Sequence, residues 1–85
     1  MEDFETYIND LKARIDLLAE IGADEPLTQR GRQYRGTRHD SLQVSPEVGL
    51  WNWHSRDIGG DIFSWCKHIR GWDFKHAVEE LARKY

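Results

Sequence analysis

The stretch from Trp51 to Asp61 constrains the fold more than any other part of this sequence. Trp51 and Trp53 alternate with polar residues, and side chains two positions apart on a strand point to the same face of a sheet. Gly59 and Gly60 then indicate a tight turn, and Asp61 is placed to cap a helix that begins directly after it. The stretch therefore predicts a strand, a turn and a helix start in succession, with at least one indole facing the core.

The composition is that of one small folded domain, which we expect to span residues 1–85. Hydrophobic residues make up 39% of the chain and include four tryptophans, which favours a packed core over a disordered tail. No apolar run approaches the roughly 18 residues of a membrane helix, and we expect no signal peptide. The only cysteine is Cys66, so no internal disulfide can form, and we expect a cytoplasmic setting without membrane contact.

The N-terminal segment predicts one helix, from about Asp3 to Ile21. Apolar residues recur there at steps of three and four and define one face, formed by Phe4, Ile8, Leu11, Ile15 and Leu18. Gly22 is a plausible end for this helix, and Pro26 prevents any continuation.

The rest of the chain predicts a small sheet followed by two helices. Gly31 indicates a hairpin turn or a bulge, and residues 46–49 indicate a turn between the last two strands. Asp61 and Asp73 can each cap a helix, and Gly71 separates the two. Strand-like alternation occurs in three segments, 33–35, 42–44 and 50–54. The predicted class is α+β, with an antiparallel sheet of three or four strands, one N-terminal helix and two C-terminal helices.

Charge is distributed unevenly along the chain. Residues 1–25 hold eight acidic and two basic residues, a charge of −6, whereas residues 57–85 hold five of each. Residues 26–56 hold five arginines against Asp40 and Glu47, a charge of +3, and the three values sum to the net charge of −3. The planar guanidinium of arginine forms bidentate hydrogen bonds to phosphate and stacks on bases better than the ammonium of lysine does. The middle segment is therefore either a nucleic-acid contact or a solvated strand surface.

The sequence offers little for catalysis or for metal binding. Cys66 lies on the apolar face of a predicted helix, where a buried structural thiol is expected rather than a nucleophile. A structural zinc site needs four cysteine or histidine ligands in paired clusters, and His39, His54 and Cys66 form no such pair. We therefore predict no enzyme activity, no metal ligand and no cofactor.

Interleaved arginines and aromatic residues on a small sheet favour a nucleic-acid-binding surface. If Trp51 and Trp53 both face the core, neither can stack on a base, and the arginines are the better candidates. The predicted contacts to DNA are Arg30, Arg32, Arg35, Arg38, Trp51, His54 and Arg56.

Several short motifs occur in one order and together indicate a family. They are Lys12–Leu18, Arg30–Gly36, Val44–Glu47, Gly59–Phe63 and Phe74–Ala82. Over about residues 10–84 the chain resembles the N-terminal zinc-binding domain of bacterial DNA primases, whose zinc ligands are Cys, His, Cys and Cys. The ordered set carries the resemblance, because no single motif in it is decisive.

The departures from that family pattern concern the metal site. The family has Cys-Pro-x-His after a Tyr-x-Gly step, whereas here Gly36 leads through a shorter loop to His39 and Asp40. The family's Cys-x-x-Cys pair falls on Trp53 and Arg56. The chain is similar in this respect to the metal-free primase-like domains that precede Toprim catalytic domains on mobile elements.

The resemblance implies a non-catalytic module that contacts single-stranded DNA and works with a Toprim-type primase or another replication protein. A protein-interaction or structural module that has lost DNA and zinc binding is the alternative. We hypothesise that Trp53, with Trp51 or Trp65, fills the volume that zinc organises in the family. Burying two indoles is worth about 10 kcal/mol at ~25 cal/mol/Å², comparable with the ~10–16 kcal/mol of a structural zinc.

Overall fold

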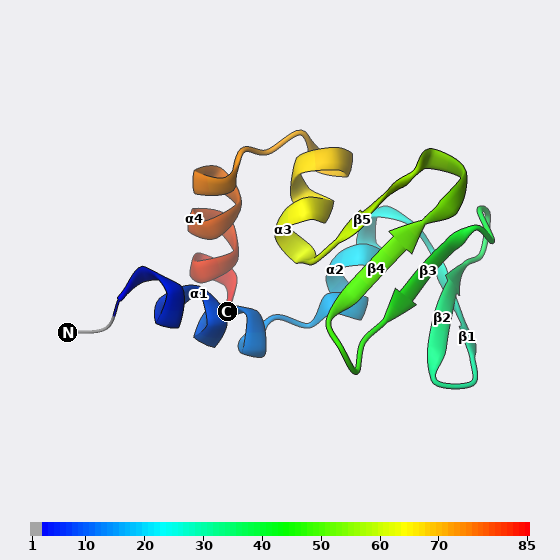
Figure 1. Cartoon of the computed structure of the whole chain (residues 1–85), viewed down its shortest axis with the longest axis horizontal. Coiled ribbons are helices and arrows are strands. Elements are labelled where there is room, and N and C mark those ends of the chain that lie inside the picture. The colour runs from blue at the N-terminus through cyan, green and yellow to red at the C-terminus, as the bar shows by residue number, and fades with distance from the viewer. Residues whose placement is uncertain (1–2) are drawn as a thin grey trace.

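Five short strands form one antiparallel sheet in the computed structural model, which describes residues 3–85. The strands pair in chain order, so the sheet is a simple meander (Figure 1). The strands are β1 (Leu27–Arg30), β2 (Gln33–Gly36), β3 (Leu42–Ser45), β4 (Leu50–Trp53) and β5 (Ile58–Gly60). The α+β class and the antiparallel sheet are confirmed, with one strand more than the predicted maximum. The predicted tight turn at Gly59 and Gly60 is wrong, because both residues belong to the short β5, which was missed since glycine is a poor strand former.

The register of the sheet divides its side chains cleanly between an inner and an outer face. Val44 lies between Tyr34 of β2 and Trp51 of β4, and Leu42 lies opposite Trp53. The inner face packs against α3 (Ile62–Trp65), because both strand tryptophans contact Trp65, and α2 (Leu17–Asp24) contributes Ile21 to the same core cluster. Trp51 is 3% exposed and Trp53 is 1% exposed, so both indoles face the core, which exceeds the prediction that at least one does.

The predicted single N-terminal helix is wrong, because the segment forms two. The helix α1 (Phe4–Arg14) ends at Ile15, whose backbone is extended, and α2 begins two residues later. Asp16 caps the second helix, since its carboxylate accepts a hydrogen bond from the backbone N–H of Ala19 at 3.1 Å. Gly22 does not end the helix but lies inside α2.

The two predicted C-terminal helices are confirmed. Asp61 caps α3 by accepting from the Ser64 N–H at 3.0 Å, and Asp73 caps α4 (Phe74–Lys84) in the same manner at 2.8 Å. The helix α3 continues into a π-helical turn, η2 (Cys66–Arg70), which Gly71 ends in a left-handed conformation with φ of 71°. Within residues 3–85, no helix combines the length and the apolar character needed to cross a lipid bilayer.

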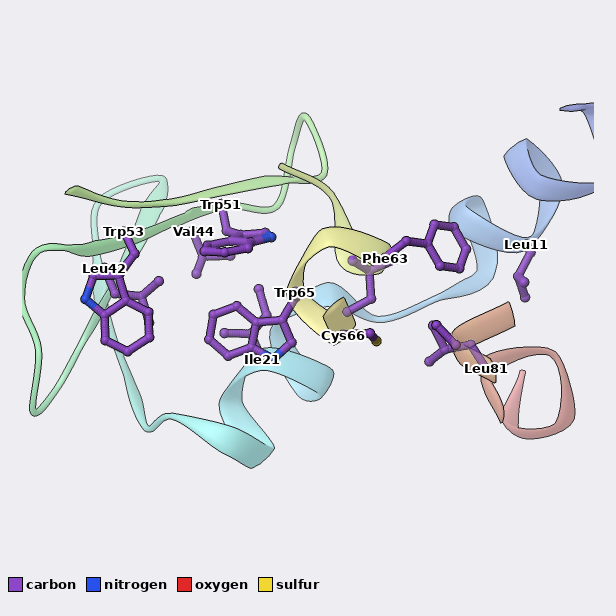
Figure 2. Packing of buried hydrophobic residues seen from close by; sticks show 12 residues of the cluster. Leu11, Ile21, Leu42, Val44, Trp51, Trp53, Phe63, Trp65, Cys66 and Leu81 are labelled. Carbon is purple, nitrogen blue, oxygen red and sulfur yellow. The ribbon is translucent and has the colours of Figure 1, made fainter. Parts of the chain in front are cut away.

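Trp65 is the centre of the core. Figure 2 shows it between the strand residues Trp51 and Trp53 on one side and Ile21 of α2 on the other. Its ring stacks on Trp53 at 6.2 Å between centroids and meets Trp51 edge-on at 4.9 Å. Cys66 is fully buried in the same cluster, as predicted, and burial raises the pKa of its thiol.

A buried carboxylate fastens the helices to one another. Glu20 of α2 is 2% exposed and accepts hydrogen bonds from Arg70 at 3.1 Å and from Lys84 and Tyr85 at 2.6 Å each. Arg70 also donates a hydrogen bond to Asp24 at 2.7 Å, so one guanidinium is bonded to the carboxylates of both Glu20 and Asp24. Burial acts to raise the pKa of Glu20, but the donated hydrogen bonds and the charge of Lys84 outweigh it and lower that pKa.

Candidate nucleic-acid interface

The outer face of the sheet carries a continuous row of polar side chains. Thr28 lies opposite Arg35, Arg35 opposite Gln43, and Gln43 opposite Asn52, whose neighbour on β5 is Gly59. Because residues two apart share a face, Arg30 and Gln33 extend the same surface toward the β1–β2 hairpin. We call this surface the open face, and it comprises Thr28, Arg30, Gln33, Arg35, Gln43 and Asn52.

Three of the predicted arginines lie on or beside the open face. Arg30 ends β1, Arg32 lies in the hairpin turn, and Arg35 is at the centre of β2. Arg35 donates a hydrogen bond to the backbone carbonyl of Asp40 at 3.3 Å. Within residues 3–85 none of these three guanidinium groups forms an ion pair with a carboxylate. Their positive charge is therefore available to a ligand.

Two loops meet at one end of the sheet, and we call them, together with Trp53, the loop corner. Loop 37–41 joins β2 to β3, and loop 54–57, which contains the 3₁₀ turn η1 (His54–Arg56), joins β4 to β5. The His54 N–H donates to the Ser41 carbonyl at 3.1 Å, and the Ser41 and Ser55 hydroxyls are 2.8 Å apart. Gly36 permits this fold, because a Cβ there would collide with the backbone carbonyl of His39.

Arg38, His54 and Arg56, which were also predicted to contact DNA, lie at the loop corner and differ in what they contact. The Arg38 guanidinium pairs with Glu25 at 3.2 Å, and His39 lies 3.9 Å from the same carboxylate. His54 is exposed and lies 3.4 Å from the Gln43 amide, so it borders the open face. The guanidinium carbon of Arg56 lies 4.1 Å above the centroid of the Trp53 ring.

Trp51 has to be removed from the set of predicted contacts. Its ring is buried against Trp65, and its indole N–H donates to the backbone carbonyl of Asp61 at 2.7 Å. Because both the face and the polar atom of the indole are engaged inside the molecule, Trp51 cannot stack on a base. Its position opposite Val44 gives it a packing role instead.

Sequence reasoning missed the polar residues that accompany the arginines. Gln43 and Asn52 lie in adjacent strands on the open face, in register with Arg35. The signal was present, because Leu42-Gln43-Val44 and Trp51-Asn52-Trp53 alternate, and an inward set implies an outward one. The pairing of the two strands, which aligns these amides, could not be seen in the local pattern.

The donor set at the loop corner does not fit a zinc ion. The two positions that the resemblance assigns to the Cys-x-x-Cys pair carry an indole and a guanidinium, and neither group binds zinc. The His39 imidazole lies beside Trp53, with ring centroids 5.4 Å apart. Across the part of the chain that the structure describes, no three His, Cys, Asp or Glu side chains gather closely enough to hold a metal ion.

The meander, the two-loop corner and the aspartate-capped helix that follows define a zinc-ribbon-like domain. The sequence matches the CHC2 zinc finger family over residues 4–85, and the chain belongs to that family. This membership confirms the resemblance to the primase zinc-binding domain.

Known proteins similar to this chain include DNA primases. The chain is 31% identical over 83 residues to the DNA primase of Halalkalibacterium halodurans, covering 91% of this chain and 14% of that protein. It is 29% identical over 86 residues to the DNA primase of Geobacillus stearothermophilus, covering 94% of this chain and again 14% of the primase. The crystal structure of the zinc-binding and RNA polymerase domains of the Aquifex aeolicus primase matches with a TM-score of 0.81 and 26% identity. That match covers 92% of this chain and 21% of the Aquifex chain, so the similarity concerns a small part of each relative.

Proposed function

We propose that this chain is a non-catalytic DNA-binding module of the primase zinc-finger type that contacts single-stranded DNA through its open face. The observation that carries the proposal is that Arg30, Arg32 and Arg35, on or beside the open face, have no carboxylate partner within residues 3–85. Membership of the CHC2 zinc finger family supports it, since the similar proteins are DNA primases. The match spans 14% of each primase, which supports an accessory role beside a separate catalytic part.

The chemistry of the open face suits a single strand. Arginines supply phosphate contacts, and the amides of Gln43 and Asn52 supply donors and acceptors for base edges or sugars. His54 adds an exposed ring at the edge of the same surface. Arg38 is a weaker candidate, because Glu25 already neutralises it.

The net charge of −3 does not count against DNA binding, because the charge is distributed unevenly over the molecule. Glu20, Asp24 and Glu25 belong to the acidic residues 1–25, and all three form ion pairs within the molecule. The local field over the open face is set by its own arginines, since exposed charges more than about 10 Å apart are largely screened at 0.1 M salt.

Fluorescence anisotropy with a labelled single-stranded oligonucleotide tests the proposal. Binding should weaken with salt, with a slope in log K of about −0.7 for each phosphate contact. Arg35→Gln should reduce that slope by about 0.7. Arg83→Gln is the matched control, because it changes the net charge equally but lies on α4 in an ion pair with Glu80. The absence of binding at low salt, or an equal loss in both variants, would remove the proposal.

We further propose that the module works with a Toprim-type primase domain or another replication protein, on the same chain or a separate one. One observation favours protein contact as a second candidate function. Phe4, Tyr7 and Phe74 are 62%, 38% and 47% exposed, and the Phe4 ring at the start of α1 lies beside both of the others. Exposed aromatic residues are enriched at protein interfaces. Retention of a primase by the wild type but not by Phe4→Ala, together with no oligonucleotide binding, would favour this function over DNA contact.

A further inference from the structure

The two positions that carry zinc-ligating cysteines in the family contact each other in this chain. Trp53 precedes the 3₁₀ turn η1 and Arg56 ends it, so the two residues are three apart. Side chains at this spacing are eclipsed in a 3₁₀ turn, which brings the guanidinium over the indole at 4.1 Å. The backbone therefore places the two side chains close together, where they contact each other and do not bind a shared metal ion.

The contact continues into the core. Trp53 stacks on Trp65 with an interplanar angle of 11°, and Trp65 in turn meets Trp51. Arg56 is exposed and Trp65 is fully buried, so Trp53 is covered by a cation on the solvent side and by an indole on the core side. His39, from the other loop, lies against the same Trp53 ring. The stack thus contacts both loops of the corner and the helix beneath them.

We infer that the Arg56–Trp53–Trp65 stack organises the loop corner of this chain in place of a metal ion. Arg56 is then a structural residue that covers Trp53, rather than a phosphate contact. Arginine suits this role because its planar, weakly hydrated guanidinium stacks on aromatic rings better than an ammonium does. The inference concerns folding alone and holds whether or not the open face binds DNA.

The first test measures metal dependence. The purified chain is analysed for zinc by mass spectrometry and is then unfolded by heat with and without a strong chelator. We expect far less than one zinc per chain and the same Tm in both buffers. One tightly held zinc per chain, with a chelator-induced fall in Tm, would overturn the inference.

The second test measures the stack itself. Arg56→Gln should lower Tm by roughly 2–8 °C, since an exposed cation–π contact is worth up to ~1 kcal/mol and each kcal/mol shifts Tm by ~4–8 °C in a domain of this size. The Tm of Arg56→Lys should lie between those of wild type and Arg56→Gln. Arg30→Gln is the matched control, because Arg30 is exposed and lies outside the stack, and its Tm should stay within about 2 °C of wild type.

A double-mutant cycle separates the stack from other effects of Arg56. In a Trp53→Leu background, Arg56→Gln should cause no further fall in Tm, because the ring it covers is gone. If Trp53→Leu does not fold, amide shifts of the Arg56→Gln variant decide the question. They should change in residues 37–41 as well as 54–57. Shifts confined to residues 54–57, or a Tm for Arg56→Gln equal to that of Arg30→Gln, would contradict the inference.

Discussion

Trp53 has a larger role in the fold than its place at the end of a four-residue strand suggests. It is 1% exposed, lies opposite Leu42 and stacks on Trp65. It also ends the strand from which the loop corner is built. A change at Trp53 therefore affects the sheet, the core and the corner together.

Trp53→Ala should destabilise the protein by about 3–5 kcal/mol, because it removes a buried ring and leaves a cavity. For a domain of this size we expect a fall in Tm of roughly 12 °C or more. Thermal unfolding followed by circular dichroism measures this change. Trp72→Ala is the control, since Trp72 is half-buried at the surface over Arg70, and its cost should be smaller. A shift of only a few degrees for Trp53→Ala would count against a core role for this indole.

At the scale of the elements, helix caps were predictable and helix continuity was not. Asp61 and Asp73 were identified as caps because a cap is a local signal, fixed by one side chain and the N–H groups three residues on. The break at Ile15 was missed because the apolar spacing continues across it, although Asp16 is itself a good capping residue. Periodicity describes a face but does not reveal that the axis of the helix has changed.

Gly60 controls how the sheet passes into α3. It has φ of 139°, and a Cβ there would lie 2.5 Å from the Ser64 hydroxyl oxygen. Gly60→Ala should therefore cost at least about 1–3 kcal/mol, through backbone strain and a clash with the first turn of α3. Gly22→Ala is the control, because Gly22 lies within α2 with open space around it, and it should be neutral or stabilising by about 0.5–1 kcal/mol. Urea unfolding of both variants measures the difference, and equal effects would contradict the strain at Gly60.

The Glu20 cluster links α2 to η2 and α4 and should make the stability depend on acid. The pKa of Glu20 is lower in the folded protein than its ordinary value of 4.5. Its contribution to the free energy of unfolding is therefore fully present above pH 4.5 and is lost as the pH falls through the folded-state pKa. Glu20→Gln should remove this part of the acid dependence, as measured by urea unfolding at a series of pH values below 4.5.

The matched control for that experiment is Glu79→Gln, since Glu79 is exposed on α4 outside the cluster. It should keep the wild-type acid dependence. Parallel curves for wild type and Glu20→Gln across the acidic range would show that the cluster does not couple protonation to folding.

At the scale of the whole molecule, the sequence predicted the class of fold and a basic middle segment, but not what each arginine contacts. Five arginines in residues 26–56 indicated one basic patch. The structure distributes them, because Arg38 is neutralised by Glu25, which is 13 residues away, and Arg56 covers Trp53. Local alternation fixes which face a side chain takes. It cannot show which distant side chain meets it there, and that is why Trp51 was wrongly included among the DNA contacts.

The order of the strands has a consequence for how the chain reaches its native state. Each strand pairs with the one that follows it, so the sheet can assemble as successive hairpins, each closed by a short loop at low entropic cost. No distant segments need to be gathered around a common centre before pairing begins. The rate-limiting event in refolding should therefore be the docking of the finished meander onto the helices, where Glu20 and Tyr85 join parts of the chain that are 65 residues apart.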